Sequence, residues 1–542
     1  MILTDILVIA ALAVLVVAWW ARPLPRRPLI LLGASLAALF AALAGVADDR
    51  WQQGVAATVA VVLLLTLLAN RLRRAPARTR PPWVSGTLFT LMAAGAVAAI
   101  VLFPVNPLPK PSGPHPVGVR SFEVADASRP GLIAAAPGQP RRLLARVWYP
   151  AADVTARKPR PYFTEAEADH TARTLGALVG FPPFFAYVKH VATNSYEDAP
   201  LLAGAKDLPV VIYSHGYTSF LGQNTALMEH LASHGYVVFS LQHTYDSSAT
   251  VFPNGDVAPA DPELFEEARR QADLDEPRPQ IQAMTGATLD ERLDGFLKVR
   301  EQAIARDERL LRSGVIWAAD RIFLHDRLQA GAVPPAIREI TAASRLDRVG
   351  EMGMSFGGAT AGTVCMTDAR CAAGVNLDGG DFPFQAFAAQ IPVPFLMFHS
   401  DLGHIYQAMG AKPDGALRGF NDFSYESFAA PGEVARVQLA GARHLGFSDF
   451  SLFVRRPVRD PLFGATPAKV MIGAQNEMVR GFFDRYLRGQ ANGFPKPQLA
   501  AYQGWVTPLA PTGVRGWWAA KTEAERAAIE ARIARARRGD AP

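Results

Sequence analysis

With 542 residues, the chain exceeds the roughly 250 to 300 residues at which one hydrophobic core stops growing, so at least two parts are expected. Its net charge of +6 comes from arginines scattered among acidic residues, with one cluster beside an apolar stretch, which favours a membrane over a nucleic-acid partner. The two cysteines, Cys365 and Cys371, exclude a multi-disulfide framework and a multi-cysteine metal site, and leave open one local bridge or two buried thiols.

The first hundred residues contain four apolar runs. They cover residues 2–20, 29–47, 55–69 and 86–103, are nearly free of charge, and approach the roughly 20 residues that a helix needs to cross the hydrocarbon. Buried helices of a soluble protein are the alternative, but four such runs in succession favour membrane helices. The first run lacks a basic start and a cleavage site, so it is not expected to be a signal peptide. The sequence predicts a transmembrane region over residues 1–104.

Charges in the loops predict the orientation of these helices. The first and third loops carry the arginines, which places them in the cytoplasm: Arg22, Arg26, Arg27, Arg71, Arg73, Arg74, Arg78 and Arg80. The second loop carries Asp48, Asp49 and Arg50 and is expected on the outside, together with the N-terminus and everything after the fourth run. Since the use of Ala, Arg and Gly hints at a bacterial chain, a bacterial inner membrane with a periplasmic C-terminal domain is expected.

Residues 105–116 are rich in proline and predict an extended linker. From there to residue 510, short β-branched runs alternate with amphipathic segments, the pattern of an α/β domain with a mostly parallel sheet and flanking helices. Expected strands are 141–149, 208–213, 236–241, 348–352, 372–377, 394–398 and 435–439, and expected helices are 224–233 and 476–487. The strand at 348–352 is the weakest, because Glu351 interrupts it.

Three segments have two interpretations each. A charged, helix-favouring insertion at about 254–345 is either a cap over an active site or a solvated decoration. Residues 181–187 (FPPFFAY) form either core packing or a lid or acyl-pocket wall. The tail, 511–542, contains a basic helix that starts at a capping box of Thr522 and Glu525, and it is either exposed or binds a membrane or a partner.

The motif Gly353-Met354-Ser355-Phe356-Gly357 follows an expected strand and opens a helix of small residues. This context is typical of a nucleophile elbow, in which a strained turn exposes a serine and glycines leave room on its flanks. We therefore expect Ser355 to be a nucleophile.

A serine nucleophile needs a histidine base and an acid that orients the base. His444 is the preferred base, since it lies in a turn after the last expected strand; His399 and His404 are expected to be structural or to line a pocket. Asp378 and Asp401 compete as the acid, and Asp381 is a third candidate. The expected oxyanion donors are the backbone amides of Tyr217, in a Ser-His-Gly-Tyr turn, and Phe356.

Several stretches, in order along the chain, resemble the platelet-activating factor acetylhydrolase family of the plasma and type II group: RLLARVWYP, PVVIYSHGYTSF, LASHGYVVFSLQHTYDSSAT, GMSFGGAT, RCAAGVNLDGGDFPF and GARHLGFSDF. The resemblance implies an α/β-hydrolase fold, an ester-hydrolysing activity without a metal cofactor, Ser355, Asp378 and His444 as the triad, and Tyr217 and Phe356 as oxyanion donors. The chain departs from the family pattern at Met354, where a histidine is frequent, and at Gly379 and Gly380, where an aromatic residue is frequent.

These features predict a membrane-anchored serine esterase without cofactor or metal, acting on a lipid ester with a short or oxidised acyl chain. A broad carboxylesterase, lipase or polyester hydrolase is the alternative within enzymes. A catalytically silent membrane receptor or scaffold with the same fold is the alternative of another class.

Overall fold

The computed structural model describes residues 1–21, 24–72, 82–130, 137–266, 278–306, 308–380, 392–412, 434–510 and 513–538. By its internal contacts the chain divides into two compact units. The first comprises Met1–Pro107, Pro161–Ala192 and Leu452–Arg459, and the second comprises Leu108–Arg160, Thr193–Ser451 and Asp460–Pro542. Two stretches inside the predicted range 117–510 thus pack with the N-terminal helices. Arg22, Arg73, Arg74, Arg78, Arg80 and Asp381 lie outside the described residues.

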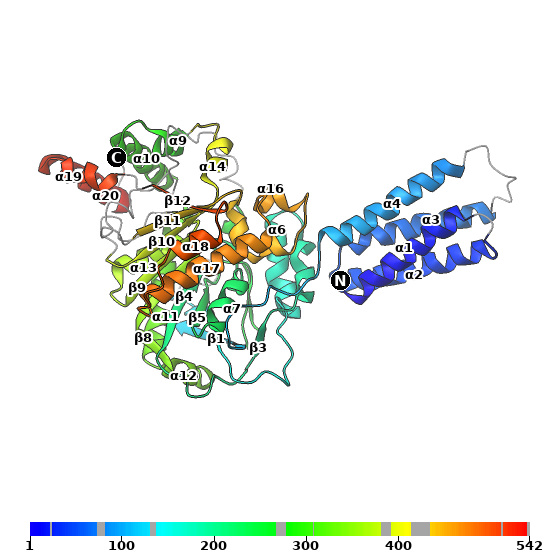
Figure 1. Cartoon of the computed structure of the whole chain (residues 1–542), viewed down its shortest axis with the longest axis horizontal. Helices are drawn as coiled ribbons and strands as arrows, with labels where there is room; N and C mark the ends of the chain where they lie inside the picture. Colours follow the sequence, from blue (N-terminus) through cyan, green and yellow to red (C-terminus); the bar gives the residue numbers. More distant parts are fainter. Residues whose placement is uncertain are drawn as a thin grey trace. The chain divides into compact units, whose positions relative to one another are not determined.

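The first unit contains a bundle of four helices, α1 (Leu3–Trp20), α2 (Arg27–Ala47), α3 (Gln53–Leu72) and α4 (Pro82–Leu102), which lie side by side (Figure 1). Each of the four predicted apolar runs forms one helix, and in the described chain all four are long and apolar enough to cross a membrane. Val8, Leu12 and Leu15 of α1 are buried in the bundle, whereas Leu3 and Val17 face outward. A helix that is apolar on every side fits a lipid environment.

A buried ion pair joins the second loop to two helices of this bundle. Arg50 and Asp5 are both fully buried, and Nε of Arg50 lies 2.9 Å from Oδ1 of Asp5. The same guanidinium donates to the carbonyls of Phe103 (2.7 Å) and Ile100 (3.1 Å). A buried charge is tolerated only when it is paired and hydrogen-bonded in this way.

The remaining parts of the first unit are short helices: α5 (Glu165–Glu167), η1 (Ala168–Ala172), α6 (Arg173–Leu178) and η2 (Pro182–His190). Phe184 and Tyr187 of η2 lie against the ring of Phe103, with centroid distances of 5.6 Å and 6.3 Å. The indole of Trp51 stacks on Phe184 at 6.0 Å. Phe184 and Tyr187 therefore pack in the core of the first unit, which agrees with the first of the two interpretations of segment 181–187.

The second unit is built on a ten-stranded sheet in the order β12-β11-β10-β9-β8-β4-β5-β2-β1-β3. Neighbours from β5 through β4, β8, β9 and β10 to β11 pair in parallel, and β1–β2, β2–β5 and β11–β12 are antiparallel. The strands are β1 (Val117–Asp126), β2 (Arg141–Pro150), β3 (Ser195–Glu197), β4 (Leu208–Ser214), β5 (Val237–Gln242), β8 (Ser344–Met354), β9 (Cys371–Leu377), β10 (Phe395–His399), β11 (Val434–Leu439) and β12 (Val506–Pro508), beside a small β6 (Thr250–Val251) and β7 (Val257–Ala258) pair. All seven predicted strands are confirmed, and β1, β3 and β12 were not predicted.

Helices pack against this sheet, as the predicted α/β class requires, whereas α9, α10, α19 and α20 gather beyond its edge (Figure 1). The described helices that follow β4 along the chain are α7 (Thr225–Ser233), α9 (Arg278–Thr285), α10 (Leu289–Ala305), α11 (Arg309–Gln329), α12 (Pro335–Ala342), α13 (Phe356–Thr367), α14 (Leu402–Ala408), α16 (Arg459–Phe463), α17 (Ala468–Tyr486), α18 (Lys496–Ala501), α19 (Val514–Ala520) and α20 (Glu523–Arg538), with the turns η3 (His444–Phe447) and η4 (Asp449–Leu452). The predicted helices at 224–233 and 476–487 correspond to α7 and to the second half of α17.

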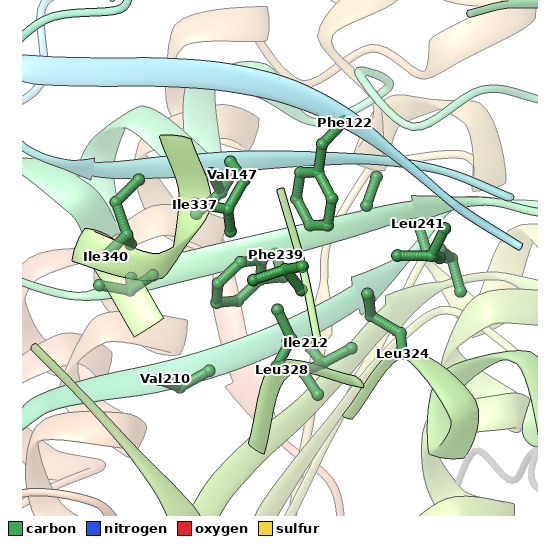
Figure 2. Packing of buried hydrophobic residues seen from close by; sticks show 14 of the residues in the cluster. Phe122, Val147, Val210, Ile212, Phe239, Leu241, Leu324, Leu328, Ile337 and Ile340 are labelled. Carbon is green, nitrogen blue, oxygen red and sulfur yellow. The ribbon is translucent and has the colours of Figure 1, made fainter. Parts of the chain in front are cut away.

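One helix of the predicted insertion belongs to the core of the sheet. Leu324 and Leu328 of α11 are buried in the same cluster as Ile212 and Phe239 of the central strands (Figure 2). Ile340 of α12 extends this layer. The helix α11 is therefore neither a cap nor a solvated decoration, because it covers strands that would otherwise expose apolar side chains.

A second buried ion pair explains the acid in β8. Glu351 is 1% exposed and pairs with the fully buried guanidinium of Arg321 on α11. Arg321 also donates to the carbonyl of Met352 (3.0 Å) in the same strand and to that of Ile212 (2.6 Å) in β4. Glu351 is compatible with a central strand because α11 supplies its counter-charge.

Two smaller features concern the cysteines and the start of the C-terminal helix. Cys365 at the end of α13 and Cys371 at the start of β9 form a disulfide. The backbone N–H of Glu525 donates to Oγ1 of Thr522, so the predicted capping box starts α20. This helix is not exposed on all sides, since Ile533 is 4% exposed and packs against α10.

Candidate active site

Ser355 lies in a sharp turn between β8 and α13. Its backbone has φ 56° and ψ −124°, a combination that non-glycine residues adopt only under strain. A Cβ atom at Gly353 would lie 2.1 Å from the backbone of Gly357, and one at Gly357 would lie 2.1 Å from the carbonyl oxygen of Ser214. Only glycine fits at both positions, which is the geometry that the pentapeptide predicts.

The structure brings Ser355, His444 and Asp378 together. Nε2 of His444 lies 2.9 Å from Oγ of Ser355, and Nδ1 of His444 lies 2.7 Å from Oδ2 of Asp378. With the imidazole proton on Nδ1, the ring donates to Asp378 and accepts from the hydroxyl of Ser355. The arrangement can transfer the serine proton to the imidazole while the carboxylate stabilises the resulting cation.

The carboxylate of Asp378 is fixed by its surroundings. Its side chain is 7% exposed, and Oδ1 accepts a hydrogen bond of 2.6 Å from the backbone N–H of Ser400. The imidazole of His444 is 47% exposed, so solvent reaches the base. Partial desolvation lowers the pKa of His444, but the hydrogen bond and the charge of Asp378 raise it by more, and the net pKa lies above its usual value.

The other acids and histidines lie in different places. Asp401 caps α14 and accepts a hydrogen bond of 2.7 Å from the backbone N–H of Gly441, so it organises two loops. His399 and His404 line the cavity described below, as expected. Asp381 lies outside the described residues.

The two expected oxyanion donors lie beside the serine. A Cβ atom on Gly216 would be 3.4 Å from Cβ of Ser355, so the Gly216–Tyr217 peptide is next to the nucleophile. Phe356 is the first residue of α13, where backbone N–H groups have no partner within the helix. The rings of Tyr217 and Phe356 touch, with centroids 5.0 Å apart.

A group of buried polar residues behind this turn was not predicted. His243, which follows β5, and Asp320, on α11, are fully buried and lie 2.9 Å apart. The available signal was the position of His243 directly after the apolar strand β5 and of Asp320 directly after Trp317 and two alanines of α11. Asp320 on α11 pairs with Arg141 of β2, and His243 bonds to Ser214 of β4, so only the folded chain brings these residues together.

A cavity of about 570 Å³ opens beside His444 and Asp378. Its walls are mainly apolar and include Met284, Leu402, Ile405, Met409, Leu445 and Leu462, while Arg443, His399 and His404 supply polar groups. Within the described residues, no cluster of three or more His, Cys, Asp or Glu side chains could hold a metal ion.

Comparison with known proteins gives three findings. The family model described as "Platelet-activating factor acetylhydrolase, isoform II" matches residues 101–275. The platelet-activating factor acetylhydrolase of Cavia porcellus is 23% identical over 401 residues, which cover 72% of this chain and 80% of that protein. The solved ferulic acid esterase of Streptomyces cinnamoneus aligns with a TM-score of 0.51 and 22% identity, over 75% of this chain and 100% of that chain, and shows the shared fold. The chain therefore has an α/β-hydrolase fold and is similar to the platelet-activating factor acetylhydrolases.

Proposed function

We propose that this chain is a membrane-anchored serine esterase with Ser355 as nucleophile, His444 as base and Asp378 as the acid that orients it. The observation that carries this proposal is the continuous hydrogen-bond chain from Ser355 through His444 to Asp378. Each member is held by its own element, so the geometry does not depend on substrate.

The reaction has two steps. Oγ of Ser355 attacks the ester carbonyl carbon while its proton passes to Nε2 of His444, and the backbone N–H groups of Tyr217 and Phe356 stabilise the oxyanion. His444 then gives the proton to the leaving alkoxide, which departs as an alcohol and leaves an acyl-enzyme. In the second step, His444 takes a proton from water and the hydroxide attacks the acyl carbonyl. His444 then returns this proton to Oγ of Ser355 as the carboxylic acid leaves.

We infer that the substrate is an apolar ester, such as a lipid ester with a short or oxidised acyl chain. The mainly apolar cavity beside His444 supports this, since apolar walls favour an acyl chain over a polar group. The similarity to platelet-activating factor acetylhydrolase supports the same substrate class. An acyl-chain panel from acetyl to palmitoyl esters tests it: the highest kcat/KM is expected for short chains, and a preference for long chains would favour a lipase.

We further propose that residues 1–104 anchor the enzyme, that residues 105–116 connect the anchor to the catalytic domain over 117–510, and that this domain lies outside the cytoplasm. The four long apolar helices support anchoring. The disulfide between Cys365 and Cys371 supports an oxidising compartment such as the periplasm, because cytoplasmic disulfides are rare.

Labelling with a fluorophosphonate probe tests the nucleophile. Wild-type protein in detergent is expected to react covalently with the probe and to lose esterase activity, whereas Ser355→Ala is expected not to react and to lack activity from the start. Ser128→Ala is a matched control, since Ser128 hydrogen-bonds to Asp126 in its own loop. Folded wild-type protein that does not label, or equal labelling of Ser355→Ala, contradicts the proposal and favours a silent receptor or scaffold.

A further inference from the structure

Behind the turn that carries Tyr217 lies a second Ser-His-Asp arrangement. Oγ of Ser214 is 2.9 Å from Nε2 of His243, and Nδ1 of His243 is 2.9 Å from Oδ2 of Asp320. All three side chains are fully buried, so no substrate reaches this serine. The arrangement must therefore serve another purpose than covalent chemistry.

The charges determine where the protons lie. Burial opposes ionisation of Asp320, but the ion pair with Arg141 and the hydrogen bond from His243 outweigh it and hold the pKa of Asp320 well below its usual value. Burial lowers the pKa of His243 to about 4, so this ring is neutral near pH 7. The carboxylate then accepts from Nδ1–H of His243, and Nε2 of His243 accepts the hydroxyl proton of Ser214.

A second histidine, His215, is bonded to the backbone of His243 and precedes the turn that carries Tyr217. The backbone N–H of His243 donates to Nε2 of His215 over 3.4 Å. Burial lowers the pKa of His215 to about 3, so this ring is also neutral, and its only proton is on Nδ1. Nδ1–H of His215 donates to the carbonyl oxygen of Gly216 over 2.6 Å.

The carbonyl of Gly216 and the N–H of Tyr217 belong to the same peptide group. In a planar trans peptide these two groups point in opposite directions, so a bond that fixes the oxygen also fixes the direction of the N–H. The preceding N–H, that of Gly216, is held by Oε1 of Gln223 over 2.8 Å. Both peptide planes that flank Gly216 are thus fixed from the interior of the protein.

Trp317 of α11 keeps the two imidazoles in place. Its ring stacks on His243 with centroids 3.8 Å apart and planes 8° apart, and lies 4.9 Å from the ring of His215. Its Nε1–H donates to Asp246 over 3.1 Å, which fixes the indole in turn. Since Trp317 is fully buried, water does not compete for these hydrogen bonds.

We propose that His215, held by His243 and Asp320, is a positioning residue that aims the backbone N–H of Tyr217 at the oxyanion of the reaction. This inference rests on the proposed serine-esterase function. It explains why α11, within the predicted insertion, is part of the core: α11 carries both Asp320 and Trp317.

The variant His215→Leu tests the proposal, because it removes the N–H donor and keeps an apolar side chain. It is expected to lower kcat by about 10- to 100-fold and to leave KM nearly unchanged, because a displaced donor weakens the transition state more than the ground state. Affinity for a trifluoromethyl ketone, which forms a tetrahedral oxyanion on the serine, is expected to fall in proportion to kcat. His215→Asn places an amide N–H near the position of Nδ1–H and is expected to recover most of the loss.

His325 provides the matched control. It is a buried histidine on α11 that hydrogen-bonds the carbonyl of Leu346 at 2.7 Å, away from the nucleophile turn. His325→Leu is expected to lower the melting temperature and to leave kcat and ketone affinity unchanged. If His325→Leu lowers kcat as much as His215→Leu does, or if His215→Asn recovers nothing, the role of His215 is only structural and the proposal is wrong.

A measurement on the wild-type protein does not depend on how the variants fold. ¹⁵N NMR of labelled histidines, assigned with the His215→Asn and His325→Leu variants, is expected to give His215 as the neutral Nδ1–H tautomer. A proton on Nε2 would remove the bond to Gly216 and overturn the proposal. The fluorophosphonate experiment distinguishes failure of the esterase function from failure of this inference. If the wild-type protein shows no labelling that depends on Ser355, the esterase function is wrong. If His215→Leu labels normally and has the wild-type kcat, only the role of His215 is wrong.

Discussion

Oγ of Ser355 and Nε2 of His444 are 2.9 Å apart, although 89 positions separate the two residues in the chain. Ser355 follows β8, Asp378 follows β9 and His444 lies after β11. Because β8 to β11 are parallel neighbours, their carboxyl ends meet at one edge of the sheet. The sheet therefore places the three side chains within hydrogen-bonding distance.

The first prediction concerns pH. The base is active when neutral, so kcat/KM is expected to fall as the pH decreases through the pKa of His444, and this pKa lies above the usual 6.5. Asp378→Asn removes the charge that raises the pKa, weakens the hydrogen bond to Nδ1, and leaves the desolvation that lowers the pKa. The acid limb should therefore move to lower pH, while kcat falls by about 10⁴-fold because the amide no longer holds the imidazole in the productive tautomer. The measurement is the pH profile of kcat/KM for a soluble ester.

Asp401→Asn is the control for this prediction. Asparagine still caps α14 and accepts a hydrogen bond, so the pH profile should remain that of the wild type. A shift of the acid limb in Asp401→Asn, with none in Asp378→Asn, would reverse the assignment of the acid.

The second prediction concerns the glycine after the acid. A Cβ atom on Gly379 would lie 2.0 Å from the carbonyl oxygen of Ser355 and 2.6 Å from Oδ1 of Asn376. Gly379→Ala is therefore expected to push the nucleophile turn out of place, with a loss of about 1–3 kcal/mol of stability and a fall in kcat of about 100-fold. Gly516→Ala in α19, where nothing lies within 4 Å of an added Cβ, should leave both kcat and melting temperature unchanged or slightly raised. Wild-type kcat in Gly379→Ala would contradict the close packing of this turn.

The third prediction concerns the buried pair of Arg321 and Glu351. Removing one partner leaves a buried charge unpaired, so Glu351→Ala is expected to lower the free energy of unfolding by about 3–5 kcal/mol. The double variant Arg321→Met with Glu351→Leu removes both charges and should be more stable than Glu351→Ala alone. Thermal unfolding in detergent gives the comparison. The control is Arg306→Ala, which is expected to cost less than about 1 kcal/mol because Arg306 is 47% exposed and 3.7 Å from Glu308. If Glu351→Ala has the same free energy of unfolding as the wild type, the ion pair does not stabilise the fold.

The elements that sequence patterns predicted are those whose signal is local. Buried strands such as β4 and β5 are continuous apolar runs, and the turn at Ser355 needs glycines at fixed spacing. The edge strand β12 is only three residues long, and β1 contains Arg120 and Glu123 at intermediate or exposed positions, so neither stands out from a loop. The same locality explains why His444 could be ranked from its place after the last strand.

Features that depend on distant partners were not predictable. Glu351 weakened the strand prediction because its counter-charge, Arg321, is on a helix thirty positions away. The helix α11 was assigned to an insertion that was either a cap or a solvated decoration, because the sequence does not distinguish its buried charges from its exposed ones. The two carboxylates Asp378 and Asp401 could not be separated from the residues alone, since both follow a strand, and the distance to His444 is a property of the folded sheet.

The last prediction concerns the orientation of the anchor. The arginine-rich third loop and the acidic second loop predict that everything after α4 lies outside the cytoplasm. Alkaline phosphatase, which folds only where its disulfides form, is expected to be active when fused after Pro116 and inactive when fused after Arg78. Replacing the arginines of the third loop by glutamine should weaken this difference, because their positive charges hold the loop inside; they are Arg71, Arg73, Arg74, Arg78 and Arg80. Activity after Arg78 and none after Pro116, in properly inserted fusions, would place the catalytic domain in the cytoplasm, where the bridge between Cys365 and Cys371 would not persist.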